Sequence, residues 1–186
     1  MKIKEILEKQ RIQKLFLCFM MYAVLGWCYE VVLETFIYKW GFRNRGVLFG
    51  PYCPVYGVGA LTFIFCLGWL MRKKEPAWLK FVKPVLIFLG CMFIATLIEL
   101  TASYIFEFTT GAWPWQTYAD YKYNFQARIA LSTSLRFGLG GLAFLYAVQP
   151  FFEWLLAKPK KRTLNIIAAA VLFIVLADCV YTFFIK

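Results

Sequence analysis

Five apolar stretches, each long enough to cross a lipid bilayer, constrain the fold of this chain most strongly. They cover residues 15–38, 48–71, 84–108, 127–157 and 165–185. A membrane-spanning helix needs about 20 mostly apolar residues. Hydrophobic residues make up 62% of the 186-residue chain, against about 45–50% in an ordinary soluble domain. We therefore expect an all-α bundle of five transmembrane helices that forms one transmembrane domain over residues 15–186.

The basic residues outside these stretches predict the orientation of the bundle. Fourteen Lys and Arg residues lie in 2–14, 72–83 and 158–162, and five lie on the opposite side. By the positive-inside rule, the N-terminus lies in the cytoplasm and the C-terminus outside. The net charge of +11 is then a topology signal, and we expect the lipid bilayer and no nucleic acid as a partner.

The segment before the first span, residues 1–14, is expected to be a cytoplasmic amphipathic helix, or alternatively a frayed basic tail. The first span is too long for a cleaved signal and contains Glu30 and Glu34, so we expect it to be retained. The six cysteines are typical of small apolar fillers. A Cys28–Cys53 bridge near the outer face is left open.

The stretch Arg43–Gly59 combines four glycines and two prolines between apolar runs. Proline is tolerated in the first turn of a helix, so Pro51 and Pro54 predict a helix that starts near Gly50, with a short re-entrant segment as a further option. Such a start directs free N–H groups and the positive end of the helix dipole toward Arg43 and Arg45. The stretch therefore predicts an anion-binding corner; the alternative is a plain turn that ends an outer loop.

Ionisable residues on four spans lie at one depth. At about 1.5 Å per residue, each lies about 12–14 Å below the outer boundary; they are Glu30, Glu99, Arg136 and Asp178. Because intramembrane charges are expensive, we expect Glu99 to pair with Arg136 and Glu107 with Arg128. We predict a polar chamber in the outer half, and an excess carboxylate there could carry a proton. The alternative is a set of static ion pairs that fix helix register.

The substrate-binding residues expected around this chamber are those that carry charge at this level or shape the outer segment. They are Glu30, Glu34, Arg43, Arg45, Gly50, Pro51, Pro54, Tyr56, Glu99, Arg128, Arg136 and Asp178. The outer loop over 109–126 is rich in Trp and Tyr, which is typical of an aromatic belt at the membrane interface, or alternatively of a lid over a ligand.

Several motifs resemble the bacterial membrane protein family named Putative ABC-transporter type IV. The resemblance rests on Gly26-Trp27 with Glu30, on Arg45-Gly46-x-Leu48-x-Gly50-Pro51-x-Cys53-Pro54-x-Tyr56-Gly57-x-Gly59, and on Glu99, Asn124 and Arg128-Ile129. It covers roughly residues 15–150. The chain departs from the family pattern at Ala119, where Trp is expected, and at Ala127, where Gly is expected. The resemblance implies a permease in the bacterial cell membrane.

Three classes of function follow. The first is a permease or substrate-binding membrane component for a small polar ligand. The chain lacks Gly-x-x-x-x-Gly-Lys-Ser/Thr, so any ATP hydrolysis by the P-loop route requires a separate ATP-binding subunit. The second is an intramembrane enzyme that uses carboxylates, because the absence of histidine excludes Ser-His pairs and histidine-bound zinc. The third is a non-catalytic scaffold or regulator. No cofactor is expected, and the oligomeric state is left open.

Overall fold

The computed structural model describes residues 11–44, 46–71 and 77–185. Within them, five helical stretches are long and apolar enough to cross a membrane: Ile12–Ile37, Pro54–Met71, Trp78–Thr110, Leu131–Ala157 and Lys161–Ile185. The predicted all-α fold with five membrane-spanning helices is confirmed. The orientation across the membrane stays a prediction. The predicted cytoplasmic helix falls largely on residues 1–10, outside the described residues.

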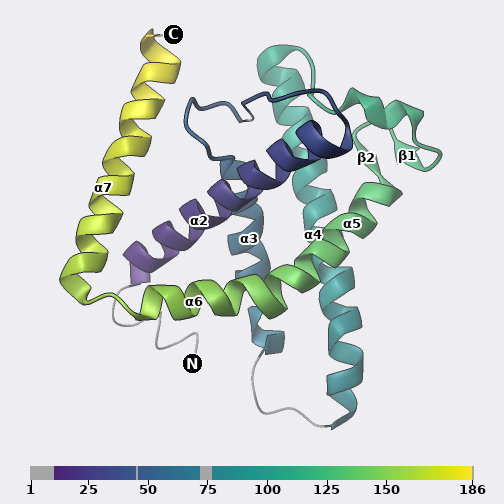
Figure 1. Cartoon of the computed structure of the whole chain (residues 1–186). Coiled ribbons are helices and arrows are strands. Elements are labelled where there is room, and N and C mark those ends of the chain that lie inside the picture. The colour runs from purple at the N-terminus through teal and green to yellow at the C-terminus, as the bar shows by residue number, and fades with distance from the viewer. Residues whose placement is uncertain (1–10, 45, 72–76, 186) are drawn as a thin grey trace. The chain divides into compact units, whose positions relative to one another are not determined.

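The elements follow one another as labelled in Figure 1. Helix α2 (Arg11–Val32) continues through a π-helical turn (Leu33–Ile37), and α3 (Pro54–Leu67) continues through a 3₁₀ turn (Gly68–Met71). Helix α4 (Ala77–Thr110) leads to a 3₁₀ turn (Gln116–Asp120) and to two short antiparallel strands, β1 (Asn124–Phe125) and β2 (Ile129–Ala130). Helix α5 (Leu131–Ala143) passes through a π-helical turn (Phe144–Val148) into α6 (Gln149–Ala157). Helix α7 (Lys161–Val180) ends in a π-helical turn (Tyr181–Ile185).

Two predicted helix starts are corrected by the structure. Helix α3 begins at Pro54 rather than near Gly50, because the chain before it folds back irregularly to bury Leu48 and Tyr52. Pro54 then occupies the first helical position, where its missing N–H is not needed. The fourth membrane-spanning stretch begins at Leu131 rather than at residue 127, because the preceding residues pair in the β1–β2 hairpin.

The chain forms two compact units, the first from residues 1–61 and 151–186 and the second from residues 62–150. Each unit has its own apolar core. The first contains Met20, Ala23, Leu48 and Tyr52, with Val171 and Val175 of α7 packed against them. The second contains Leu67, Leu70, Ile87, Cys91 and Leu145. The single transmembrane domain expected over 15–186 stays a prediction.

Glycines allow neighbouring helices to approach closely in both units. In the first unit, a Cβ on Gly57 of α3 would lie 2.8 Å from the backbone oxygen of Phe19 on α2. In the second unit, a Cβ on Gly141 of α5 would overlap the side chain of Cys91 on α4. These contacts leave no room for a methyl group, so the glycines set the helix separation.

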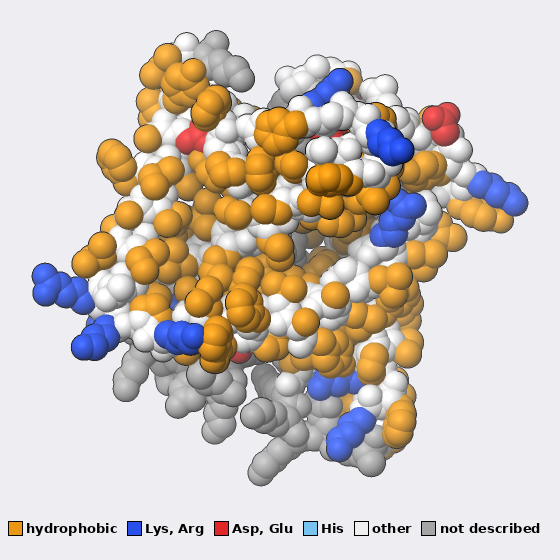
Figure 2. All heavy atoms as spheres, viewed as in Figure 1, with side chains coloured by type: hydrophobic (Ala, Val, Ile, Leu, Met, Phe, Trp, Pro, Cys, Tyr) orange, Lys and Arg blue, Asp and Glu red, His pale blue; other side chains and the backbone are white. Residues whose placement is uncertain are grey.

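The surfaces of the spans are largely apolar. Figure 2 shows hydrophobic side chains spread over the visible helix faces. Large side chains such as Phe81, Phe173 and Phe184 are 84%, 74% and 84% exposed. A soluble protein rarely exposes so much contiguous apolar surface, whereas lipid-facing helices do. The exposed faces therefore agree with a bilayer as the surrounding medium.

The contact between Gly57 and Phe19 predicts that two glycine-to-alanine variants in α3 differ in stability. Gly57→Ala should destabilise the protein by about 1–3 kcal/mol, because the new methyl group meets the Phe19 backbone. Gly59→Ala is the matched control, since a Cβ added there would have no atom within 4 Å. Thermal unfolding in detergent should show a lower Tm for the first variant and an equal or higher Tm for the second. Equal losses in both variants would contradict this account of the packing.

Candidate functional site

An asparagine holds the shape of the segment between α2 and α3, which is named the outer segment here after its predicted side of the membrane. The Trp27 indole N–H donates to Asn44 Oδ1 over 2.7 Å, and Asn44 Nδ2 donates to the Phe49 carbonyl over 2.7 Å. Gly46 has a φ of +103°, a conformation that a side chain would strain. The Cys53 N–H donates to the Ala23 carbonyl of α2 over 2.9 Å, which fixes the end of the segment just before α3.

Asp178 of α7 binds this segment through a set of convergent donors. The backbone N–H groups of Phe49 and Gly50 donate to its two carboxylate oxygens over 3.0 and 2.8 Å. The Tyr52 hydroxyl also donates to Asp178, and Thr182 donates to it over 3.0 Å. We call the donors of Phe49, Gly50 and Tyr52 the carboxylate cradle. Because each oxygen receives hydrogen bonds, the cradle compensates for the desolvation of a charge within a membrane span.

The tyrosine of the cradle stays a hydrogen-bond donor. Tyr52 is 5% exposed, and this burial, followed by its hydrogen bond to Asp178, raises its pKa above the ordinary value for tyrosine. Gly50 is required beside it, because a Cβ at this position would overlap the Tyr52 ring.

A second tyrosine binds the other carboxylate of this unit. The Tyr56 hydroxyl of α3 donates to Glu30 of α2. Gly26 makes the approach possible, since a Cβ there would overlap the Tyr56 ring. Tyr29 packs edge-on against Tyr56, with ring centroids 6.3 Å apart. The helix that directly follows the carboxylate cradle, α3, therefore supplies the partner of Glu30.

The remaining predicted residues of this unit lie in different surroundings. Glu34 is 2% exposed and therefore buried. Arg43 and Pro51 are exposed, Pro54 is the first residue of α3, and Arg45 lies outside the described residues. The predicted anion-binding corner stays a prediction; the structure shows that backbone N–H groups of this segment donate to Asp178 of the same chain. The donors come from the irregular segment and not from the first turn of α3, because the helix starts later than predicted.

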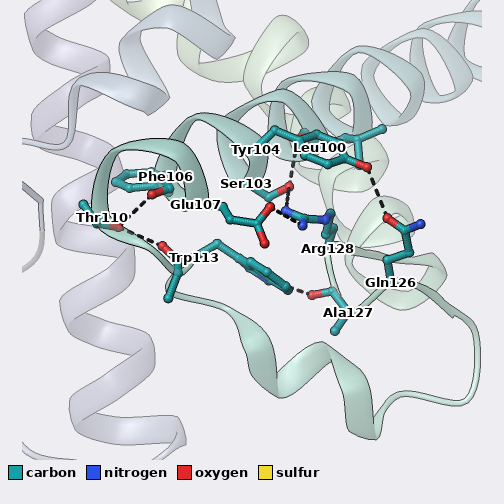
Figure 3. A network of polar contacts seen from close by, with 11 residues as sticks. Leu100, Ser103, Tyr104, Phe106, Glu107, Thr110, Trp113, Gln126, Ala127 and Arg128 are labelled. Carbon is teal, nitrogen blue, oxygen red and sulfur yellow. Dashed lines mark hydrogen bonds and ion pairs between the residues drawn. The ribbon is translucent and has the colours of Figure 1, made fainter.

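In the second unit, Arg128 is enclosed by charged, polar and aromatic groups (Figure 3). Its Nη2 lies 2.5 Å from Glu107 Oε2, and its Nη1 donates to Ser103 Oγ over 3.3 Å. The guanidinium also stacks on the rings of Tyr104 and Trp113, with 4.1 and 4.0 Å to the ring centroids. Arg128 is only 7% exposed. The predicted Glu107–Arg128 pair is confirmed, and the two aromatic rings add cation–π stabilisation.

The tryptophans of the outer loop bind the backbone that carries Arg128. Trp113 Nε1 donates to the Ala127 carbonyl over 3.0 Å, and Trp115 Nε1 donates to the Arg128 carbonyl over 2.8 Å. Asn124 Oδ1 accepts from the Ala127 N–H over 3.0 Å. These hydrogen bonds hold the hairpin in place. The sequence analysis weighed an aromatic belt against a lid for this loop and did not predict this structural role.

The predicted Glu99–Arg136 pair is not formed among the described residues. Glu99 Oε1 accepts a hydrogen bond from the Tyr118 hydroxyl over 2.7 Å, while Arg136 is exposed on α5. Burial, and then the charge of Glu99, raise the pKa of Tyr118, so this hydroxyl stays protonated and donates. Depth along a helix was the only basis for this pair, and it does not determine which neighbours a side chain contacts.

The four ionisable groups expected at one level are divided between the units. Glu30 and Asp178 belong to the first unit, and Glu99 and Arg136 belong to the second. A single chamber that contains all four stays a prediction. Cys28 and Cys53 form no disulfide, so the bridge left open by the sequence is absent between these two described residues.

A family model described as Putative ABC-transporter type IV matches residues 17–183 of the 186-residue chain. The chain belongs to this family. No curated protein and no solved structure matches it. The family match extends beyond residue 150, the limit of the motif resemblance, and so includes α7 and Asp178. The predicted family is confirmed.

Several residues on which the ABC-transporter type IV resemblance rests are now explained by contacts. Gly26, Glu30 and Tyr56 form one helix–helix contact, and Gly50 donates to Asp178. The sequence analysis did not predict Tyr52 and Thr182 as partners of Asp178, or Tyr118 as the partner of Glu99. It also missed the hydrogen bond between Asn44 and Trp27. A signal existed for Tyr52, which lies between the two prolines of the most specific motif.

The departure from the family pattern at residue 127 also has a structural reading. Ala127 has a φ of +54°, in the left-handed region that glycine adopts without strain. This ABC-transporter type IV chain therefore has a strained residue at the position where the sequence analysis expected glycine.

The strain predicts that one substitution stabilises the protein. Ala127→Gly should raise the stability by about 1 kcal/mol, because a non-glycine residue costs about 1–2 kcal/mol in this conformation. Ala130→Gly is the control: its φ of −140° suits alanine, so the change should lower stability. The measurement is thermal unfolding of the two purified variants. A lower Tm for Ala127→Gly would show that the left-handed conformation carries no strain.

The carboxylate cradle predicts a local effect of Asp178→Asn. The amide group of Asn is nearly the same size but carries no charge and only one acceptor oxygen. Loss of hydrogen bonds to a charged group should cost about 1.5–3 kcal/mol. Hydrogen exchange at residues 49–52 should become faster than in the unsubstituted protein.

Thr182→Val is the matched control for this exchange measurement, because it removes one side-chain bond to Asp178 and leaves the backbone donors bound. It should change exchange at residues 49–52 less than Asp178→Asn does. Unchanged exchange in Asp178→Asn would mean that Asp178 does not hold the segment.

Proposed function

We propose that this chain is the membrane permease component, or a substrate-binding membrane component, of an ABC-type transporter for a small polar molecule in the bacterial cell membrane. Membership of the Putative ABC-transporter type IV family and the five membrane-spanning helices support this proposal. The sequence has no P-loop, so ATP hydrolysis by that route belongs to a separate subunit.

The observation that carries the proposal is the carboxylate cradle around Asp178. Two backbone N–H groups and a tyrosine hydroxyl converge on one carboxylate. Backbone N–H groups bind any carboxylate or phosphate of suitable shape, because they recognise oxygen acceptors and negative charge. The cradle thus has the chemistry needed for the anionic group of a substrate, and Asp178 occupies it when no substrate is bound.

In this proposal the substrate displaces Asp178 and takes over its hydrogen bonds. Such an exchange balances donors and acceptors, so it avoids the cost of leaving buried donors unpaired. Arg43 precedes the cradle by six residues in the sequence and is exposed, so its charge attracts anions from solution. Gly50 and Tyr56 shape the segment, Pro51 and Pro54 end it at α3, and Glu30 holds Tyr56. Glu99, Arg128 and Arg136 belong to the second unit, and their part in substrate binding stays a prediction.

Chemical rescue by acetate tests the cradle as a ligand site. Asp178→Ala removes the internal carboxylate and leaves the donors of Phe49, Gly50 and Tyr52 without it. Added acetate should then raise the Tm of Asp178→Ala, with little effect on the unsubstituted protein, because a ligand that binds only the folded state stabilises it. Gly57→Ala is the control, since it is destabilised at a site that acetate cannot fill. Absence of rescue at high acetate would contradict the proposed ligand site.

Copurification tests the transporter assignment itself. The tagged chain is extracted in mild detergent from its native membrane and reconstituted in liposomes. A polypeptide with a P-loop should copurify with it, and the complex should hydrolyse ATP. Isolation of the chain in quantity with no ATP-binding polypeptide and no hydrolysis would overturn the assignment.

A second candidate function, a non-catalytic membrane scaffold or regulator, is favoured by one observation. Several charges within the spans and the hairpin have partners within the protein: Asp178 binds the cradle, and Arg128 is enclosed by Glu107, Ser103 and two aromatic rings. Static networks of this kind fix a structure without a ligand. Acetate rescue with an ATP-binding partner favours the permease, whereas a soluble partner that binds without either result favours the scaffold.

A further inference from the structure

A groove on the second unit lies between the outer loop and the start of α5. It has a volume of about 420 Å³ and is lined by Asp120, Tyr121, Lys122, Tyr123, Leu131, Ser132 and Leu135. Two charged residues of opposite sign belong to the loop side, and two leucines belong to the helix side. The groove therefore combines a polar edge with an apolar wall, as a site for an amphipathic molecule does.

Arg136 of α5 does not line this groove but lies next to it in the helix, directly after the lining residue Leu135. It follows Ser132 by four residues, so both residues lie on one helix face. Side chains of an α-helix lean toward its N-terminus, which for α5 is the end that carries the groove. The long arginine side chain can therefore bring its guanidinium toward Ser132 while its methylene groups cover apolar surface.

Arg136 is an exposed charge within a membrane-spanning stretch and forms no ion pair with any described residue. The two carboxylates of α4 are bound elsewhere: Glu107 pairs with Arg128, and Glu99 accepts from Tyr118. A cation in this position is costly unless an anion or water reaches it. An anion from outside the protein can reach the exposed Arg136 and would offset this cost.

The same helix face offers an apolar track beside this charge. Leu131, Leu135 and Leu139 follow one another at intervals of four and are 48%, 42% and 62% exposed. An acyl chain that lies along them would place its headgroup at the level of the groove.

We propose that this groove, together with Arg136, binds an anionic phospholipid of the bilayer. The lipid phosphate pairs with Arg136 and the Ser132 hydroxyl, and Lys122 supplies a second positive charge at the edge. Asp120 repels the phosphate but accepts hydrogen bonds from hydroxyl groups, such as those of a glycerol headgroup. The site is independent of the carboxylate cradle and assigns Arg136 to a lipid rather than to the predicted chamber.

The test compares lipid binding to the purified, delipidated protein by native mass spectrometry. Phosphatidylglycerol is the anionic probe, and phosphatidylcholine is the zwitterionic one. The unsubstituted protein should bind phosphatidylglycerol about tenfold more tightly, as expected for a charge-assisted contact. Arg136→Gln should reduce this preference to within about twofold, and Arg136→Lys should keep most of it. Arg162→Gln, an exposed residue of the first unit, should leave it unchanged.

Ser132→Glu keeps the proposal testable if Arg136→Gln fails to fold. It places a carboxylate one helical turn from Arg136, so Arg136 gains an internal partner and the lipid preference should be lost. Equal binding of the two lipids by the unsubstituted protein would overturn the proposal. A full tenfold preference in a folded Arg136→Gln or Ser132→Glu variant would do the same. Displacement of the lipid by inorganic phosphate would also overturn it, since the site would then bind a free anion.

Discussion

The hydrogen bonds between Asp178 and the carboxylate cradle are the interaction on which the first unit depends. A carboxylate within a membrane-spanning helix is costly, and two backbone N–H groups, a tyrosine and a threonine offset that cost. The same bonds satisfy backbone groups of an irregular segment that has no helical partners of its own. Because the cradle begins at Phe49 and ends at Tyr52, it holds the chain where Leu48 and Tyr52 enter the core. The position of α3, and with it the Tyr56–Glu30 contact, follows from this arrangement.

The second unit contains a buried cation, Arg128, whose charge must also be stabilised away from water. Arg128 lies in the hairpin just before α5, and Glu107 near the end of α4 neutralises it. Tryptophans of the outer loop bind the hairpin backbone on either side of the charge. Removal of one partner from such a network is expected to cost more than the pair contributes, because it leaves the other charge buried and unpaired. Two tryptophans of this loop therefore help to position the hairpin that carries the buried charge.

The sequence predicted those features that depend on local patterns. The apolar spans were identified because hydropathy is a property of neighbouring residues. The Glu107–Arg128 pair was expected from equal depth on two helices, and it forms although Arg128 lies in the hairpin before α5 rather than on a helix. Depth does not fix the rotation of a helix about its axis, which is why the Glu99–Arg136 pair was wrong. The start of α3 was misplaced because Pro51 and Pro54 both suit a first turn, and only burial of Tyr52 decides between them. The hydrogen bonds of Tyr52 and Tyr118 were missed because a tyrosine hydroxyl leaves no periodic pattern.

The most direct measurement of the central interaction is a double-mutant cycle between Tyr52→Phe and Asp178→Asn, followed by unfolding of the purified protein. If the Tyr52 hydroxyl and the Asp178 carboxylate bind each other as the structure has them, the two changes are coupled by about 1 kcal/mol or more. The double variant should then lose clearly less stability than the sum of the single losses. Additive losses would contradict the carboxylate cradle as the contact that holds the outer segment to α7.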